Sequence, residues 1–249
     1  MEYDGNEVLT TGTGLIQTAT IEEEETISIW QQQVWIIRSM DLPNDEGKGF
    51  SEDIRLNEGR IVCDGSYKYG RSSSAFIPIT KNAFLGTSIV PGRTEDQSAY
   101  RGELGGILGC IISIKIICQR FEVHKGKVTI GCDCEGAIAA CEGDRSVSCS
   151  WKCYDIVSRI KHELKDSDID FVFRHISGHQ DKIKSFEELD IWEQTNVKVD
   201  KFAKKALSDY VAEVPLSRGD KWLLTMDNVP ITSDIKTTVY NSKWLEAGK

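Results

Sequence analysis

Three strand-like segments followed at once by one long helix-like segment restrict the possible folds of this chain more than any other feature. The segments at 60–66, 74–80 and 83–90 are apolar or alternate apolar with polar residues, and turn residues separate them. The segment at 98–120 has apolar residues at three- and four-residue steps, as one face of a helix does. The pattern predicts an antiparallel three-stranded meander with a long helix packed on one face.

Strands and helices alternate in the rest of the chain. Apolar runs at 127–132 and 169–176 predict short buried strands, and segments with helical character lie at 135–141, 151–164 and 196–210. Alternation of this kind adds parallel strands to the meander. The predicted fold class is therefore α/β, a mixed sheet with helices on both faces.

Composition divides the chain into three parts. Residues 1–58 form an acidic N-terminal segment that we expect to be partly disordered, and 26–38 within it could be a strand or a short helix. Pro, Gly and acidic residues gather at 41–58 and predict a linker. The folded domain is expected at 59–212, and 213–249 form a C-terminal extension to which the sequence assigns no role.

The net charge of −9 lies entirely in the first quarter of the chain. Residues 1–60 carry 13 acidic and 4 basic residues, whereas 61–249 carry 26 of each. Overall charge therefore cannot drive nucleic-acid binding, and a local patch or bound cations would be needed. The acidic N-terminus is unlike a signal peptide, and the longest purely apolar stretches are only a few residues. We expect an intracellular protein, in cytoplasm or nucleus, with no membrane-spanning segment.

The eight cysteines indicate reduced thiols rather than a disulfide framework. Two close pairs, Cys132-x-Cys134 and Cys149-x3-Cys153, raise the question of a zinc site. No histidine lies at metal-ligand spacing to either pair. Buried free thiols are therefore the preferred interpretation.

Four acidic residues fall where a protein core has no use for them. Asp64 ends the first apolar run, and Asp133 directly follows the strand predicted at 127–132. Glu103 and Asp200 lie about one turn into the first and the last of the predicted helices. Each alone has an ordinary explanation, because Asp133 could cap a helix and Asp200 could lie on a solvated helix face.

Together, carboxylates that converge on one edge of a sheet would be costly without a bound cation. Carboxylate oxygens are the ligands that Mg²⁺ and Mn²⁺ prefer. Two such ions can activate a water molecule and stabilise the leaving oxygen of a phosphodiester. The pattern thus predicts a metal-dependent site, provided that the four acids meet.

The residues around these acids resemble a known family. CDGSY around Asp64, QSAYRGELGGIL around Glu103, IGCDCEGA around Asp133 and TNVKVDKFAKKAL around Asp200 resemble the four carboxylate motifs of type 1 ribonuclease H. ISGHQD at 176–181 resembles the family's Gly-His loop. The resemblance covers about 59–211 and predicts a ribonuclease H-like fold. It is closest to the ribonuclease H domains that follow reverse transcriptase in retrotransposon polyproteins.

The resemblance implies a role for each motif residue. Asp64 would bridge two Mg²⁺ ions, with Mn²⁺ as a substitute; Glu103 and Asp133 would complete one ion site and Asp200 the other. Glu103 would also lie near the 2′-hydroxyl beside the scissile phosphate. His179 would assist proton transfer or product release, unless it is a loop histidine of no consequence.

Three further residues are candidates for substrate binding. Ser98 at the start of the long helix could offer a hydroxyl and free N–H groups to a phosphate. Tyr100 could stack on a sugar or base. Asn196 could contact the substrate or, as the safer interpretation, cap the last helix. His175 lies within a predicted strand and is interpreted as structural.

The leading functional prediction is an endoribonuclease that hydrolyses the RNA strand of RNA–DNA hybrids. Departures from the family leave alternatives open. An insertion at 178–193 lengthens the segment between His179 and Asp200. Ala99-Tyr100 occupy positions where cellular members of the family often have asparagines. The basic handle, a family segment rich in Lys and Arg, is minimal here. Tethering to a reverse transcriptase domain could restore affinity. The alternatives are a polynucleotidyl transferase or 3′–5′ exonuclease, and a catalytically degenerate domain that binds nucleic acid or acts as a scaffold.

Overall fold

A computed structural model describes a central domain and two short flanking regions. The residues described are 8–11, 14–20, 40–92, 94–143, 147–148, 150–208, 222–226 and 229–230. The predictions for 26–38, Cys149 and most of 213–249 lie outside them.

The central domain is built on a mixed sheet of six strands in the order β3-β6-β5-β4-β7-β8. Strands β4, β5 and β6 form the predicted antiparallel meander, and β7 and β8 add to β4 in parallel. The strands are β3 (Met40–Asp41), β4 (Gly59–Lys68), β5 (Arg71–Pro78), β6 (Leu85–Val90), β7 (Gly126–Cys132) and β8 (Ile169–His175).

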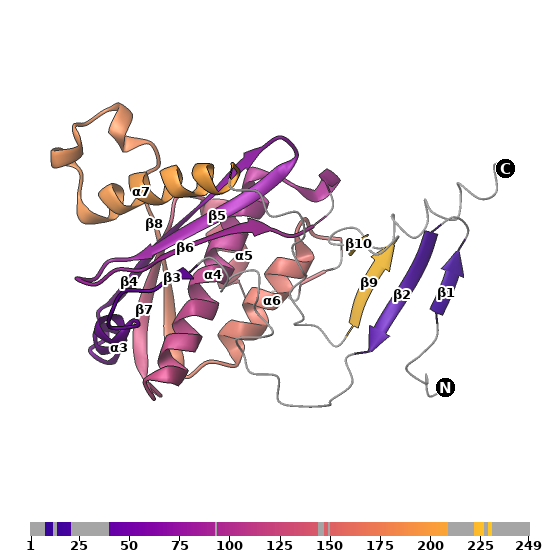
Figure 1. The fold of residues 1–249 in the computed structure, drawn as a ribbon, viewed down its shortest axis with the longest axis horizontal. Coiled ribbons are helices and arrows are strands. Elements are labelled where there is room, and N and C mark those ends of the chain that lie inside the picture. Colours follow the sequence, from indigo (N-terminus) through magenta and orange to yellow (C-terminus); the bar gives the residue numbers. More distant parts are fainter. Residues whose placement is uncertain are drawn as a thin grey trace.

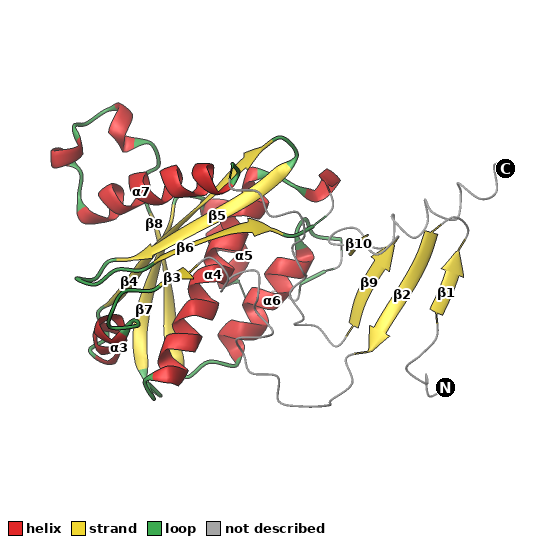
Figure 2. Ribbon diagram, in the orientation of Figure 1, coloured by secondary structure: helices red, strands yellow, loops and turns green. Residues whose placement is uncertain are grey.

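Helices cover both faces of this sheet, as predicted. Helices α4, α5 and α6 lie on one face and α7 lies on the other (Figures 1 and 2). The helices are α3 (Lys48–Arg55), α4 (Ala99–Arg120), α5 (Glu135–Glu142), α6 (Tyr154–Lys165) and α7 (Ile191–Ala206). Three 3₁₀ turns, η1 (Thr94–Asp96), η2 (Gln180–Lys182) and η3 (Phe186–Glu188), lie in connecting segments.

An apolar core lies on each face of the sheet. The larger one joins α4 and α6 to the sheet and includes Leu104, Ile111 and Ile160, all fully buried. The smaller one joins α7 to the sheet through Val199 and Ala203. Burial on both faces explains why β4 and β7 are apolar without strict alternation.

Helix α4 is long and apolar enough to cross a membrane by length and composition, the only such helix among the described residues. The expectation that no segment is long and apolar enough to span a membrane is therefore wrong by these two measures. The apolar window of α4 is 89% buried inside the domain, as is usual for the core helix of a soluble fold.

The expected linker at 41–58 is wrong. Met40–Asp41 forms β3 and pairs with β6, and Phe50 and Ile54 of α3 are fully buried in the larger core. Two of the acidic residues that suggested a linker, Glu52 and Asp53, lie on the more exposed side of this amphipathic helix. Folded structure thus begins before Gly59, and the division into three domains stays a prediction.

The expectation of disorder at the N-terminus is also wrong where the structure describes it. Strands β1 (Val8–Thr11) and β2 (Gly14–Thr20) form a hairpin, and β2 pairs with β9 (Trp222–Met226). With β10 (Val229–Pro230) they make a second sheet, in the order β1-β2-β9-β10. Residues from both extensions therefore pair with each other.

The last helix begins five residues earlier than predicted. Asp190 is the N-cap of α7: its side chain accepts a hydrogen bond from Glu193 N, and Glu193 reaches back to the Asp190 N–H. This capping box lay inside the segment predicted as an insertion. Asn196 is consequently an interior residue of α7, and the interpretation of Asn196 as a cap is wrong.

Candidate active site

Strand pairing brings Asp64 and Asp133 to the same end of two neighbouring strands. Val62 on β4 pairs with Gly131 on β7 in parallel register, and each acid lies two residues further along the chain, Asp64 on β4 and Asp133 directly after β7. Asp64 is only 4% exposed. Burial and then the charge of Asp133 raise the pKa of Asp64 to about 7. The shift indicates that these carboxylates lie close enough to repel each other.

Glu103 reaches Asp64 because α4 lies directly against β4. A Cβ added to Gly65 would lie 2.2 Å from the Glu103 nitrogen, and one added to Gly102 would lie 3.0 Å from Ser66 N. Only glycine permits this close approach of two backbones. The side chains of Asp64 and Glu103 lie close enough that each shifts the pKa of the other. Burial, followed by neighbouring anionic groups, raises the pKa of Glu103 well above its usual range.

Cys132 belongs to this cluster, which the sequence interpretation missed. The side chains of Glu103, Cys132 and Asp133 offer ligand atoms within 4.8 Å of one another. The Cys132 thiol lies 3.6 Å from Glu103 Oε2, to which it donates. Its position was deducible, because alternation along β7 places Cys132 on the same buried face as Ile130.

Among the described residues, the group of ligand atoms that could hold a metal ion contains Cys132 but not Cys134. Cys134 instead is the N-cap position of α5 and donates its backbone N–H to the Cys132 sulfur at 3.4 Å. Asp133 therefore does not cap that helix, so this alternative role for it is wrong. The described cysteines are free, and all except Cys134 are buried, as predicted.

Asp200 approaches the cluster from the opposite face of the sheet. Its side chain lies on the third turn of α7 and is 24% exposed, and it pairs with Lys204 Nζ at 2.6 Å. The negative charge of Asp200 contributes to raising the pKa of Asp64. Asp64 and Asp200 thus lie outside the group of Glu103, Cys132 and Asp133 whose ligand atoms are within 4.8 Å of one another, but the pKa of Asp64 responds to all three other acids.

The Gly-His loop lies against Asp133. A Cβ on Gly178 would be 2.5 Å from Asp133 Oδ2, so the loop backbone touches this carboxylate. His179 follows with a left-handed backbone (φ 55°) and an exposed side chain, and it starts η2. His175 Nε2 lies 3.2 Å from the Asp133 carbonyl oxygen, and its Nδ1 lies 3.7 Å from Glu135 Oε1. His175 thus contacts both neighbours of Cys134 in sequence, and its interpretation as structural stays a prediction.

The three predicted substrate-binding residues occupy different environments. Ser98 is the N-cap of α4 and accepts a hydrogen bond from Arg101 N at 3.1 Å. Tyr100 packs partly against the larger core, and burial raises the pKa of its hydroxyl to about 12. Asn196 is 4% exposed, and its Oδ1 has no hydrogen-bond partner among the described residues.

A buried ion pair that the sequence did not predict holds the start of α4. The Arg101 guanidinium is fully buried and bonds both Asp155 carboxylate oxygens, at 3.0 and 2.6 Å. Its Nε donates to the Pro91 carbonyl at 2.7 Å. The pair ties α4 to α6 two residues before Glu103, which fixes the direction from which Glu103 enters the site.

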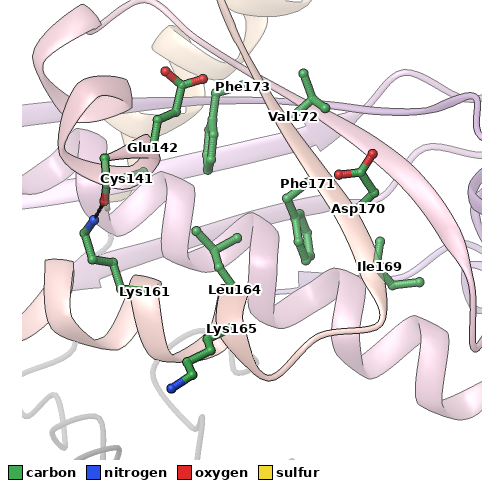
Figure 3. Close-up of a pocket in the computed structure, with 11 residues that line it drawn as sticks. Cys141, Glu142, Lys161, Leu164, Lys165, Ile169, Asp170, Phe171, Val172 and Phe173 are labelled. Carbon is green, nitrogen blue, oxygen red and sulfur yellow. Dashed lines mark hydrogen bonds between the residues drawn. The ribbon is translucent and has the colours of Figure 1, made fainter. Parts of the chain in front are cut away.

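A hollow of about 650 Å³ lies between α5, α6 and β8 (Figure 3). Leu164, Phe171 and Phe173 form its apolar wall, and Lys161 donates a hydrogen bond to the Gly143 carbonyl at its edge. It contains none of the predicted site residues. The carboxylate cluster, and not this hollow, is therefore the candidate active site.

Comparison with solved structures finds ribonucleases H1 at low similarity. LC11 ribonuclease H1, isolated from compost by a metagenomic approach, is 13% identical with a TM-score of 0.42 over 61% of this chain and 97% of that chain. The same enzyme in complex with an RNA/DNA hybrid is 12% identical, with a TM-score of 0.45 over 61% of this chain and 97% of that chain. Ribonuclease H1 from the halophilic archaeon Halobacterium salinarum is 13% identical, with a TM-score of 0.40 over 61% of this chain and 98% of that chain.

No protein-family model and no curated protein matches the sequence. The mixed six-stranded sheet, with its antiparallel meander, two parallel strands and helices on both faces, is the ribonuclease H-like α/β arrangement predicted. The prediction of fold class is therefore confirmed.

Proposed function

We propose that this chain is an endoribonuclease that hydrolyses the RNA strand of RNA–DNA hybrids and uses two divalent cations, Mg²⁺ or Mn²⁺. The observation that carries the proposal is the convergence of Asp64, Glu103, Asp133 and Asp200, which come from β4, α4, the end of β7 and α7. A core gains nothing from gathering four carboxylates, because their mutual repulsion opposes folding.

The donor set fits hard divalent cations. Burial, and then neighbouring acidic groups, raise the pKa values of Asp64 and Glu103, and a bound cation would stabilise the charged form of both. Asp64, Glu103 and Asp133 would hold one cation, and Asp64 with Asp200 the other. When bound, such ions supply Lewis-acid activation of a water molecule and stabilisation of a leaving oxygen.

The remaining residues would position the substrate and the ligands. Lys204 holds the carboxylate of Asp200, and the Gly178 backbone limits where the Asp133 carboxylate can turn. The exposed imidazole of His179 is available to carry a proton between the site and water. The cap at Ser98 leaves N–H groups of the first turn of α4 for a phosphate.

We further propose that the chain derives from a retroelement, is intracellular and works beside a reverse transcriptase domain. The long segment between His179 and Asp200 supports this, because the retroelement ribonuclease H domains that the sequence resembles tolerate an insertion there. Free thiols in the described part of the chain support a reducing compartment.

The second candidate is a catalytically degenerate domain that binds nucleic acid or acts as a scaffold. One observation favours it: Lys204 forms an ion pair with Asp200, which, like Asp64, lies outside the cluster of Glu103, Cys132 and Asp133. If Lys204 kept this carboxylate from a cation, the second ion would be lost.

The deciding experiment is cleavage of a labelled RNA–DNA hybrid with Mg²⁺ or Mn²⁺. We expect RNA-strand products with 5′-phosphate and 3′-hydroxyl ends, lost with EDTA and in Asp64→Asn. Asp168→Asn, an exposed acid outside the cluster, is the matched control and should keep full activity. Intact RNA at high enzyme concentration in Mn²⁺ would favour the degenerate domain.

A further inference from the structure

The tip of the β4–β5 hairpin exposes two tyrosines. Lys68 pairs with Arg71, which leaves Tyr69 and Gly70 as a two-residue turn. The side chain of Tyr69 is 84% exposed and that of Tyr67 is 46% exposed. Neither ring belongs to either apolar core.

The backbone at Tyr69 is strained. Tyr69 has φ 54° and Gly70 has φ 73°, so both turn residues lie in the left-handed region. A turn of this kind favours Asn or Asp followed by Gly, because a bulky residue clashes in that conformation. Since an exposed ring makes no packing that offsets the strain, Tyr69 points to a role outside the fold.

The chemistry of the tip suits a nucleotide. Lys68 Nζ lies 4.7 Å from the Tyr69 ring centroid, and Arg71 places a second cation at the base of the turn. In a nucleotide complex, the cations would contact the phosphate and the aromatic rings would stack on the base. Thr94 of η1 lies next to Gly70, so the acidic residues of η1 offset part of this charge. Stacking on the rings is therefore the main attraction.

We propose that Tyr67 and Tyr69 form a stacking platform for an unpaired nucleotide at the junction between single strand and hybrid duplex. Bases inside a duplex are already stacked, so an exposed ring gains most from an unpaired base. Tyr67 lies three residues after Asp64 on β4, and Tyr69 lies five residues after Asp64, in the turn that follows β4. Along an extended chain these steps are about 10 and 17 Å. That span corresponds to roughly three to five nucleotides of one strand. The proposal rests on the proposed function for the position of the cut.

Binding in EDTA tests the platform independently of hydrolysis. The probes are a fluorescent blunt hybrid and the same hybrid with a five-nucleotide single-stranded overhang. We expect wild-type protein to bind the overhang form at least about five-fold more tightly. Tyr67→Ala and Tyr69→Asn should abolish this preference and leave blunt-hybrid affinity unchanged. Leu56→Ala, an equally exposed apolar residue at the other end of the domain, should change neither.

A thermal melt separates binding from folding. Asn suits the left-handed turn, so Tyr69→Asn should melt at or above the wild-type temperature. With Mg²⁺, wild-type cuts should cluster roughly three to five nucleotides from the junction, and the tyrosine variants should scatter them. Equal affinity of wild-type protein for both probes, or equal weakening of both probes by the variants, would overturn the proposal. Overhang preference without any cleavage would instead uphold the platform and refute the proposed nuclease.

Discussion

The backbone of Gly65 on β4 touches the backbone of Glu103 on α4, since a Cβ at residue 65 would lie 2.2 Å from the Glu103 nitrogen. Both partners in this contact are main chain, so neither can move aside without shifting a strand or a helix. The contact sets how closely α4 lies on the sheet. It therefore also sets whether the Glu103 carboxyl reaches Asp64.

We expect Gly65→Ala to lower the free energy of unfolding by about 3 kcal/mol and to abolish hybrid cleavage, because α4 must move away from β4. Urea denaturation and the hybrid assay measure the two effects. Gly143→Ala is the matched control: the nearest atom to its added Cβ is 3.7 Å away, so stability should change little. Wild-type stability in Gly65→Ala would contradict the close approach.

The ion pair of Arg101 and Asp155 should matter far more to stability than an exposed pair. Asp155→Ala leaves a fully buried guanidinium without its carboxylate, so we expect a loss of about 3–5 kcal/mol in urea denaturation. Arg120 and Glu46 form the comparison, since both are more than 40% exposed. Glu46→Ala should cost at most about 1 kcal/mol. Similar losses in the two variants would mean that the Arg101 pair does not anchor α4.

Local sequence signals predicted most elements of the central domain. The meander and α4 followed from periodicity and turn residues, because each of these segments is long and buried on a consistent face. The start of α7 was missed because its capping box, Asp190 and Glu193, lies among other acidic residues. Helix α3 was missed because only Phe50 and Ile54 carry its apolar side.

The site was predicted residue by residue, but its packing was not. The motifs supplied Asp64, Glu103, Asp133 and Asp200, since each occurs in a recognisable local sequence. Alternation along β7 could have placed Cys132 on a buried face, but its contact with Glu103 and the ion pair of Arg101 with Asp155 both arise between elements distant in sequence. No local pattern encodes such pairings, so only the folded arrangement reveals them.

Metal-free protein should become less stable as pH rises through the site's titration range. The folded-state pKa of Asp64, about 7, lies above its ordinary value of 3.8, so the folded protein holds this proton longer than the unfolded chain. The stabilisation that protonated Asp64 gives the folded protein is fully present below about pH 4 and is lost as the pH rises to about 7. It amounts to at most roughly 4 kcal/mol of the free energy of unfolding.

Urea denaturation in EDTA across this pH range measures the effect. The quantity to compare is the free energy of unfolding of the wild type minus that of Asp64→Asn. The difference should shrink on adding Mg²⁺, and Mg²⁺ affinity should increase with pH over the same window, because a proton must leave before the carboxylate binds. If the difference between the two proteins were independent of pH, Asp64 would not be in the repelling cluster.

Asn196 should contribute to activity at the expense of stability. Its buried Oδ1 lacks a partner among the described residues, and an unsatisfied buried carbonyl costs about 1–3 kcal/mol. Asn196→Leu, which keeps the branching at Cγ, should therefore leave the free energy of unfolding unchanged or raise it by about 1 kcal/mol. If substrate donates to this oxygen, kcat/KM on the hybrid should fall at least about ten-fold.

Thr195→Val is the matched control for Asn196, because Thr195 is equally buried and its hydroxyl bonds only the Ile191 carbonyl one turn earlier. It should keep its activity, with stability within about 1 kcal/mol of wild type. A large loss of stability in Asn196→Leu with unchanged kcat/KM would assign Asn196 to the packing of α7. Unchanged stability together with reduced kcat/KM would assign its amide to the substrate, four residues before the carboxylate of Asp200 on the same helix.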